Sequence, residues 1–310
     1  MPRVAFLTLE DRKDYVIDDE LAITELRRRG IDAHEIPWSR ADVDWSTFDL
    51  VIVRTTWDYH LRADEFLDAL ARIEASGATL ENPRELIVWN LDKRYLRDLA
   101  ARGVPIVPCA WSDDTAPHDF ASLFATLDSA EIVVKPVVSA NAVDTFRLHA
   151  PLSAEQRDDL AGTFREREWF AQPFVQSVVD EGEISVFYFD GTLSHAIIKR
   201  PKHGDFRVQE EHGGLIAALP LTDDVRHAAD RVIRAVSPAP FQARVDLVRL
   251  HDGTLAVIEL EMIEPSLYFR TDAKASGNFA DAVVRRLAIA SPSHTSAQAR
   301  QRTGPLSRKL

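Results

Sequence analysis

The spacing of hydrophobic residues along the chain predicts which segments form strands and which form helices. Short apolar runs indicate buried strands, and apolar residues three or four positions apart indicate helices packed on a core. In the N-terminal part these patterns predict a strand at 4–9, a helix at 15–29, strands at 31–36 and 48–53, a helix at 63–75 and a short strand near 79–80. This alternation predicts an open parallel sheet that ends near Asn82.

Beyond Asn82 the patterns predict a mixture of helices and paired strands. Helices are expected at 83–89, 92–102, 120–127, 223–236 and 278–289, and strands at 131–135, 146–149, 169–175, 183–190 and 193–199. The last two of these strands flank Gly191 and should form a hairpin. Proline lacks a backbone N–H, so the strand that contains Pro173 is expected at a sheet edge or in a crossover.

The most informative stretch, 244–269, has the pattern of another hairpin around a turn at 251–253. Because side chains two apart on a strand share a face, its second strand divides into two sets of residues. Ala256, Ile258, Leu260 and Met262 are predicted to face the core, and Val257, Glu259, Glu261 and Ile263 to face the opposite side. An otherwise apolar strand therefore carries two carboxylates on one face.

Two interpretations of these carboxylates follow from the residues. With Asp246 of the partner strand they form a group of three, which would repel one another and lose hydration unless cations offset that cost. Oxygen ligands without a nearby His or Cys suit a hard ion, Mg²⁺ before Zn²⁺. In the alternative, the two glutamates lie on an edge strand in water, and Asp246 pairs with Arg244.

The composition narrows the class of protein. The chain has 310 residues, enough for two or three domains, and is 45% hydrophobic, an ordinary globular balance. Its net charge of −12 argues against a nucleic-acid-binding protein, because phosphates are neutralised by basic side chains. A single cysteine, Cys109, excludes a disulfide framework and is expected to be a small core residue. Neither a signal peptide nor a membrane-spanning run is recognised, which predicts a cytoplasmic protein.

Two further features point to a ligand site. The third strand ends in Arg54-Thr55-Thr56-Trp57-Asp58-Tyr59, and ligands bind at the carboxyl ends of strands in open α/β sheets. Arg54 would suit a substrate carboxylate, although Trp57 could instead pack in a loop where Arg54 pairs with Asp58. Lys135 lies in an apolar run, and buried lysines are rare unless they are paired or face a ligand, so it is interpreted as functional.

Taken in order, the motifs resemble those of the ATP-grasp ligases, in the glutathione synthetase-like branch, over about residues 3–290. They are Asn90-x-Asp92-Lys93, V-V-K-P at 133–136, Gln172-Pro173-Phe174-Val175, Gly182-Glu183-x-Ser185, Arg200-x-x-x-Gly204-Asp205-x-Arg207, Gly213-Gly214, Arg244-x-Asp246 and Glu259-x-Glu261. The resemblance implies an ATP-grasp fold of class α/β and α+β. An N-terminal open parallel α/β domain would precede two α+β subdomains that sandwich ATP.

Four segments follow from this resemblance. They are an N-terminal α/β domain at 1–82, a central ATP-grasp subdomain at 83–176, a C-terminal ATP-grasp subdomain with the metal and phosphate site at 177–290, and a mobile tail at 291–310. The tail is rich in Ser, Thr, Arg, Gln and Pro, which favours mobility. We expect deletion of 291–310 to leave the rate of ADP release unchanged, and a large loss would show that the tail contributes to activity.

The resemblance also implies roles for individual residues. ATP would be bound by Lys93, Lys135, Ser139, Gln172, Pro173, Phe174, Val175, Glu183 and Lys199, with the strand 172–175 meeting adenine and Glu183 the ribose. Mg²⁺, usually two ions in such enzymes, would be held by Asp246, Glu259 and Glu261, and Arg244, Lys199 and Arg207 would serve catalysis. An amino-acid-like substrate would contact Arg54, Thr55, Thr56, Asp58, His212, Gly214 and Ser266.

The implied reaction is ATP-dependent activation of a carboxylate as an acyl phosphate, followed by attack of a nitrogen nucleophile. The motifs at 54–59, 138–145 and 259–265 are most similar to the subgroup that includes the cyclo-ligases of D-cycloserine biosynthesis, which close O-ureido-D-serine into a ring. An intermolecular amide ligase, a small-molecule kinase and a non-catalytic ATP-binding module are the alternatives. Dimers are common among related ligases, so a homodimer is also an expectation of this resemblance.

Two departures from the family pattern bear on the site. The loop Ser139-Ala140-Asn141-Ala142 has no glycine, whereas the family usually covers the phosphates with a Gly-rich loop. Backbone approaches phosphate most closely at glycine, so this loop would cover ATP differently. Glu261 stands where the family often has Asn, which adds negative charge to the expected metal site.

Overall fold

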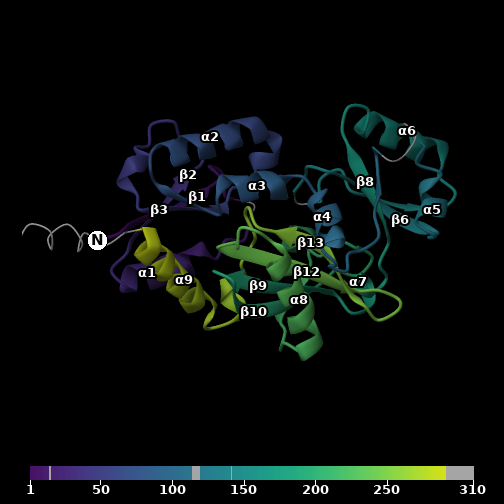
Figure 1. Cartoon of the computed structure of the whole chain (residues 1–310). Helices are drawn as coiled ribbons and strands as arrows, with labels where there is room; N and C mark the ends of the chain where they lie inside the picture. The colour runs from purple at the N-terminus through teal and green to yellow at the C-terminus, as the bar shows by residue number, and fades with distance from the viewer. Residues whose placement is uncertain (14, 114–118, 141, 291–310) are drawn as a thin grey trace, which may run out of the picture.

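The computed structural model describes residues 1–13, 15–113, 119–140 and 142–290; the predicted mobile tail at 291–310 lies outside them. Its first sheet has the order β2-β1-β3-β4, and every pairing in it is parallel, as predicted (Figure 1). Its elements are β1 (Arg3–Thr8), α1 (Asp19–Arg28), β2 (Asp32–Pro37), β3 (Leu50–Thr55), α2 (Ala63–Ala75) and β4 (Thr79–Glu81). All six residues of β3 are buried, because apolar cores lie on both faces of this sheet.

The second sheet has the order β5-β8-β6-β7 and stands at the far end of the molecule in Figure 1. It belongs to a segment with α3 (Arg84–Leu91), α4 (Tyr95–Ala101), β5 (Ala110–Trp111), α5 (Leu123–Thr126), β6 (Glu131–Pro136), β7 (Phe146–His149), α6 (Ala154–Thr163) and β8 (Trp169–Pro173). The prediction that β8 is an edge strand or crossover is wrong, since it pairs with β5 and β6. Pro173 is accommodated because β5 pairs only as far as Ala171.

The third sheet is antiparallel, in the order β11-β10-β9-β12-β13. Its segment contains α7 (Ser177–Asp180), β9 (Glu183–Phe189), β10 (Thr192–Arg200), β11 (Leu215–Ala218), α8 (Asp223–Ala235), β12 (Gln242–Arg249), β13 (Leu255–Glu261) and α9 (Ala275–Ala290). Both predicted hairpins are present, β9–β10 and β12–β13. Short 3-10 helices lie at Trp45–Thr47, Tyr59–Leu61, Glu210–His212 and Phe269–Thr271.

A β-bulge in β13 corrects the predicted division of its faces. Asp246 of β12 pairs with Glu259, but the next residue, Leu247, pairs with Val257, so Ile258 is the extra residue. Val257 therefore joins Leu260 in the core, and Ala256 packs in a separate small cluster that Ile258 also contacts. A bulge shifts the alternation by one position, which periodicity alone does not reveal.

The last helix packs against the N-terminal part of the chain. Helix α9 lies beside α1 (Figure 1), and Phe279 packs edge-on against Phe6 of β1 with ring centroids 5.8 Å apart. Arg29, the residue after α1, also pairs with Asp281. The C-terminal helix thus shares a core with the first sheet. The domain boundaries at 82 and 176 stay predictions.

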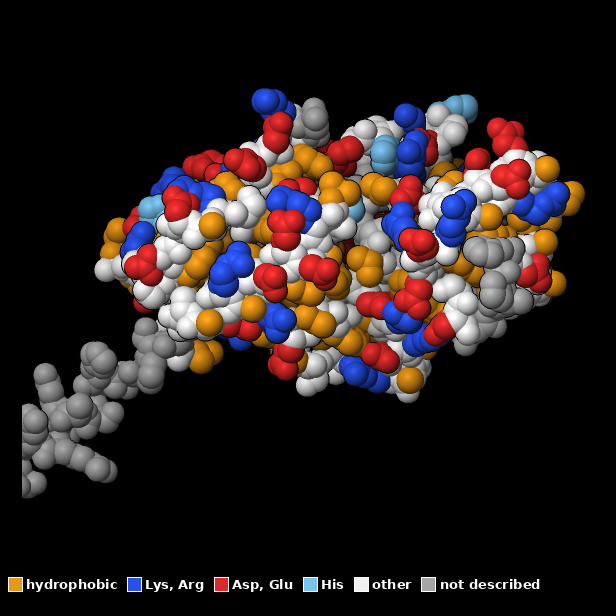
Figure 2. All heavy atoms as spheres, turned by 90° about the horizontal axis from the view of Figure 1, so that it is seen from above, with side chains coloured by type: hydrophobic (Ala, Val, Ile, Leu, Met, Phe, Trp, Pro, Cys, Tyr) orange, Lys and Arg blue, Asp and Glu red, His pale blue; other side chains and the backbone are white. Residues whose placement is uncertain are grey.

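Several element ends differ from the predictions. The helix predicted within 15–29, with Asp18 or Asp19 as its possible N-cap, is α1, which begins at Asp19 with Asp18 at the N-cap position. Helix α4 begins at Tyr95 rather than at 92, and α5 is limited to Leu123–Thr126. Helix α6 was not predicted, although Ser153 and Gln156 form a reciprocal cap at its start. Among the described helices, none is both long and apolar enough to span a bilayer. On the face in Figure 2, basic and acidic side chains are interspersed.

A buried glutamate between β4 and α9 should make stability depend on pH. Burial raises the pKa of Glu81 to about 7 from an ordinary 4.5, against the opposing effect of Arg286, which lies 3.1 Å away. Because the folded protein binds this proton more tightly, the Glu81 contribution is fully present below pH 4.5 and lost as pH rises through 7.

We therefore expect the wild-type free energy of unfolding to fall by about 3 kcal/mol between those pH values relative to Glu81→Gln. Urea unfolding at a series of pH values measures this difference. The exposed Glu85→Gln variant should keep the wild-type slope, and equal slopes in all three proteins would contradict the prediction.

Candidate active site

An open cavity of about 1520 Å³ lies between the second and third sheets. Its walls come from β6 and β8 on one side and from β9, β10, β12 and β13 on the other, with the segment after β13 at one end. The sequence-predicted residues that line it are Lys93, Lys135, Ser139, Gln172, Pro173, Phe174, Val175, Glu183, Lys199, Arg207, Arg244, Glu259, Glu261 and Ser266. The cavity thus gathers residues that are up to 173 positions apart, counted from Lys93 to Ser266.

Charged side chains face this cavity from four neighbouring strands, because strand alternation and register bring them onto one face of the third sheet. Lys199 of β10 lies directly opposite Glu183 of β9 and pairs with it. Lys199 also lies 3.4 Å from Asp246 of β12. Opposite charges therefore alternate across the sheet, which offsets the cost of their burial.

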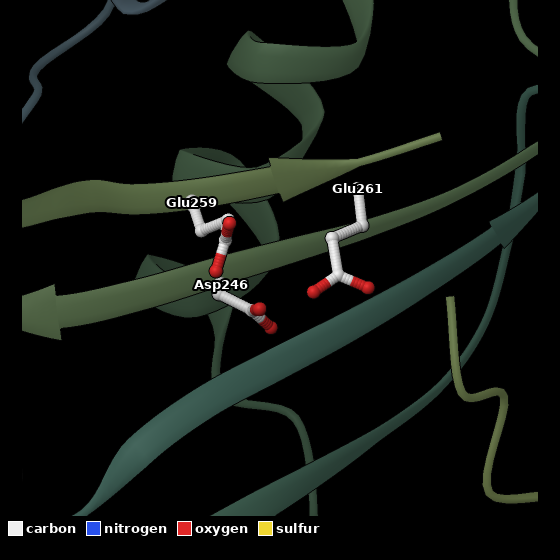
Figure 3. Close-up of side chains that lie close together, drawn as sticks. All are labelled: Asp246, Glu259 and Glu261. Carbon is white, nitrogen blue, oxygen red and sulfur yellow. The ribbon is translucent and has the colours of Figure 1, made fainter. Parts of the chain in front are cut away.

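The three predicted metal ligands converge on this face. One carboxylate oxygen from each of Asp246, Glu259 and Glu261 lies within 4.8 Å of the other two, and Figure 3 shows the three side chains on neighbouring strands. Asp246 is fully buried and accepts a hydrogen bond from Ser185. Its carboxylate also pairs with Arg244 at 2.8 Å, and Arg244 contacts Glu261 as well. An all-oxygen donor set of three acids fits a hard divalent cation such as Mg²⁺.

The alternative interpretation of these acids is partly correct. Strand β13 is an edge strand of its sheet, and Asp246 does pair with Arg244. The two glutamates nevertheless line the cavity, and each has a cationic partner within the protein: Lys93 lies 3.1 Å from Glu259, and Arg244 contacts Glu261. They are therefore parts of a charged site rather than solvated edge residues.

The surroundings shift the pKa values of the three acids in different directions. Burial opposes ionisation of Asp246, but Arg244 and Lys199 hold its pKa below the ordinary value. Burial also opposes ionisation of Glu259, and Lys93 and Lys135 lower its pKa in the same way.

Glu261 behaves differently from these two acids. Burial and the charges of Glu259 and Asp246 raise the pKa of Glu261 to about 7, with Arg244 opposing. A cluster with this much mutual repulsion favours a bound cation.

Two lysines approach the cavity from the second segment. Lys93 donates a hydrogen bond to the Ser139 carbonyl oxygen at 2.8 Å and so joins the glycine-free loop to Glu259. Lys135 donates to Gln172 Oε1 at 3.1 Å, and burial lowers the pKa of Lys135. Positive charge on both lysines faces the space in front of the carboxylate cluster. Such charge suits phosphate oxygens.

The strand predicted to meet adenine lines the same cavity. Gln172 to Val175 form the end of β8 and the residues after it, and Phe174 is held by Arg147, whose guanidinium carbon lies 3.7 Å from the ring centroid. Cys109 contacts Gln172 at 3.4 Å, and burial raises the pKa of the Cys109 thiol to about 11. A thiol with a raised pKa is a poor nucleophile, which fits its predicted structural role.

The structure corrects the predicted substrate loop at 54–58. Arg54 is 1% exposed and binds Asp19 at 2.8 Å, Gln242 at 3.1 Å and the Pro265 carbonyl oxygen at 3.2 Å, so direct contact with a substrate carboxylate is wrong. Its pairing with Asp58 is wrong as well, because Asp58 accepts from Trp38 and Arg62. Thr55 donates to Thr8 at 2.7 Å. The buried Thr56 is not among the described residues that line the cavity.

Two further predicted substrate residues, His212 and Gly214, are not among the described residues that line the cavity, although their neighbours Gln209 and Glu211 are. Gly214 is packed against the backbone, since a Cβ atom there would lie 2.0 Å from the Val208 carbonyl oxygen. Close packing of the loop therefore explains the glycine at this position. Ser266 is the one predicted substrate residue among the seven that lines the cavity.

The end of the cavity nearest the predicted substrate loop, called the substrate end below, includes Trp57 and Tyr59 of that loop. Glu264 and Tyr268 also belong to it, and sequence reasoning missed these two. Trp57 and Tyr59 line it from the loop after β3, and Glu264 and Tyr268 line it from the segment after β13. Trp57 Nε1 donates to the Glu264 carbonyl oxygen at 2.9 Å, which ties the two segments together. Burial and the charge of Glu261 raise the pKa of Glu264 to about 8. The motif Glu259-x-Glu261-x-x-Glu264 contains this third acid. Because Glu264 lies beyond the end of the strand, alternation does not predict which way its side chain points.

Asn90 of α3 binds the backbone of β13, the strand that carries two of the three predicted metal ligands. Its side chain donates to the Leu260 carbonyl oxygen and accepts from the Met262 N–H, both at 2.8 Å. Asn90→Leu would leave both buried backbone groups without that partner, so we expect the free energy of unfolding to fall by about 2 kcal/mol or more. Chemical denaturation measures the change, with Val88→Ala on the exposed side of the same helix as control. A value within 0.5 kcal/mol of wild type, roughly the range of surface substitutions, would contradict this role.

Comparisons with known proteins agree with this geometry. Residues 4–82 match the family described as the N-terminal domain of D-cycloserine synthetase DcsG. Over 281 residues the chain is 34% identical to the cycloserine biosynthesis protein DcsG of Streptomyces lavendulae, an alignment that covers 84% of this chain and 91% of that protein.

Solved structures show the same fold. The crystal structure of D-cycloserine synthetase DcsG has a TM-score of 0.80 and 32% identity, covering 92% of this chain and 99% of that chain. The ATP-grasp ligase PsnB, solved with a phosphomimetic variant of its minimal precursor, Mg and ADP, has a TM-score of 0.65 at 16% identity, covering 92% and 98%. The predicted fold and the predicted enzyme class are confirmed, and the chain belongs to the DcsG family of ATP-grasp ligases.

Proposed function

We propose that this ligase uses Mg²⁺ and ATP to close O-ureido-D-serine into D-cycloserine. The observation that carries the proposal is a cluster of three carboxylates within 4.8 Å of one another, of which Glu259 and Glu261 line one cavity and Asp246 is buried beside them. Three lysines and two arginines line the same cavity, namely Lys93, Lys135, Lys199, Arg207 and Arg244. Such an arrangement suits a metal–nucleotide complex beside a substrate carboxylate. The similarity to DcsG proteins supports the choice of substrate.

The reaction proposed has two steps. In the first, a carboxylate oxygen of the substrate attacks the γ-phosphorus of ATP, which forms an acyl phosphate and releases ADP. In the second, the ureido nitrogen attached to oxygen attacks the acyl carbon and loses its proton, and phosphate leaves. D-cycloserine has no carbamoyl group, so addition of water must also release that group as carbamate.

The side chains of this chain bind and orient the reactants. Lys93 and Lys135 would neutralise phosphate oxygens, and the strand end at 172–175 would receive the adenine. Arg244 and Arg207 would face the oxygen charge that develops on the phosphoryl and acyl groups. Glu183 and Lys199, which pair with each other, would lie beside the nucleotide.

The metal would occupy the carboxylate cluster. Asp246, Glu259 and Glu261 would hold Mg²⁺, for which two ions stay a prediction of the family resemblance. When bound, Mg²⁺ supplies positive charge that offsets the charge on the transferring phosphoryl group. A cytoplasmic location is part of this proposal because ATP is available there, and a homodimer stays a prediction.

The experiment is incubation with Mg²⁺, ATP and O-ureido-D-serine, with ADP measured by a coupled assay and the product by mass spectrometry. The proposal predicts ADP and D-cycloserine in equal amounts. ADP with an amide-linked product from added amines would instead indicate an intermolecular ligase, and a stable phosphorylated product would indicate a kinase. ATP binding without ADP release on any of a panel of carboxylates would indicate a non-catalytic module.

A further inference from the structure

The substrate end of the cavity contains an acid that the proposed metal and nucleotide sites leave unused. Glu264 is 8% exposed and lines the cavity, three residues after the last proposed metal ligand, Glu261. Burial raises the pKa of Tyr59, and the Glu264 carboxylate lies close enough to the Tyr59 hydroxyl to raise that pKa further. A carboxylate buried to this extent is costly unless it serves a partner.

The protein holds this acid in place through its N-terminal part. Trp57 Nε1 binds the Glu264 carbonyl oxygen at 2.9 Å, and Arg54 binds the carbonyl oxygen of the next residue, Pro265, at 3.2 Å. Gln242 Nε2 binds the Ile263 carbonyl oxygen at 3.1 Å on the other side. Three consecutive carbonyl groups are thus fixed by buried side chains, which sets the direction of the Glu264 side chain.

The surroundings of Glu264 suit a positive group. Trp57 and Tyr59 lie beside Glu264, Tyr268 lines the same cavity, and aromatic faces attract cations. Lys93, a lysine whose charge acts on Glu264, already lies 3.1 Å from Glu259. Because burial and the charge of Glu261 disfavour the ionised form of Glu264, an ammonium group bound beside it would stabilise the carboxylate and pair with it.

We propose that Glu264 binds the ammonium group of the amino-acid substrate and so selects amino acids over carboxylic acids that lack an amino group. The inference rests on the proposed function for the presence of a carboxylate substrate in this cavity. An ammonium group beside Glu264 would leave the substrate carboxylate free to reach the phosphates. Arg54, Trp57 and Tyr59 are positioning residues in this scheme.

The test compares two substrates in two proteins. Wild type and Glu264→Gln are assayed with O-ureido-D-serine and with its analogue in which hydrogen replaces the α-amino group. Glutamine keeps the shape and the contact with Tyr59 but carries no charge. We expect the preference of wild type for the amino substrate, as a ratio of kcat/KM values, to fall by about 30-fold or more in the variant. The KM for ATP should stay within twofold, and the exposed variant Glu155→Gln should keep the full preference.

The outcomes separate this inference from the proposed function. An equal preference in wild type and Glu264→Gln, or an equal loss of kcat on both substrates, would overturn the role of Glu264. If wild type converts a different amino acid instead, the proposed function is contradicted, and the same comparison with that amino acid and its analogue decides on Glu264. Turnover restricted to acids without an amino group would overturn the inference directly.

Discussion

Glu259→Gln is expected to reduce ADP release by about 1000-fold or more while the protein stays folded. Glu259 is one of the three converging carboxylates and lies 3.1 Å from Lys93. Glutamine fills the same space but removes the negative charge that a divalent cation requires. Loss of metal-derived stabilisation worth several kcal/mol corresponds to a rate change of this size.

The measurement is ADP release at saturating Mg²⁺ and ATP, beside a thermal unfolding curve for each protein. The matched change Glu85→Gln, at an exposed residue of α3, should leave the rate near wild type. Partial recovery at high Mg²⁺ concentration would agree with weakened metal binding. Normal turnover in a folded Glu259→Gln protein would show that the carboxylate cluster has another role.

Lys199→Met is expected to lower the free energy of unfolding by about 3–5 kcal/mol in the absence of ATP. Lys199 is buried and pairs with Glu183, and it lies 3.4 Å from Asp246. Burial and Arg244 lower the pKa of Lys199, but Asp246 and Glu183 raise it above the ordinary value, so the ammonium form is kept. Removing it leaves buried carboxylates without this partner.

Two further variants test whether the loss of stability in Lys199→Met comes from the unpaired buried carboxylates. Combining Lys199→Met with Glu183→Gln should recover part of the lost stability, because the acid left alone becomes neutral. Lys202→Met removes an exposed lysine that lies 3.9 Å from Asp205, and we expect a change below about 1 kcal/mol. Urea unfolding provides all the values. Equal losses for Lys199→Met and Lys202→Met would contradict the account of the buried pair.

The sequence predicts a residue's position correctly where strand alternation holds both in its own strand and in the strand that pairs with it. Alternation in the two antiparallel hairpins places Glu183, Lys199, Asp246, Glu259 and Glu261 on one face, and register then brings them together. Lys135 was recognised because a lysine in an apolar strand requires a partner, and it binds Gln172. The parallel sheet followed from alternation of strands and helices, since that order permits few topologies.

The failures have identifiable causes. Arg54 was assigned to substrate because it follows a strand, but its partner Asp19 is 35 positions away and could not be recognised locally. The bulge at Ile258 shifts the alternation of side chains between the two faces of β13 by one position, and the residue composition of the strand does not reveal it. For α6, the Ser153-x-x-Gln156 signal of a capping box was present in the sequence and could have been used.

The most direct test of the central claim follows an oxygen atom from the substrate carboxylate. O-ureido-D-serine labelled with ¹⁸O in both carboxylate oxygens is incubated with Mg²⁺ and ATP, and the phosphate and product are analysed by mass spectrometry. An acyl phosphate predicts one ¹⁸O atom in each phosphate released and one in the product. Unlabelled phosphate formed together with ADP would contradict carboxylate activation, and with it the role assigned to this cavity.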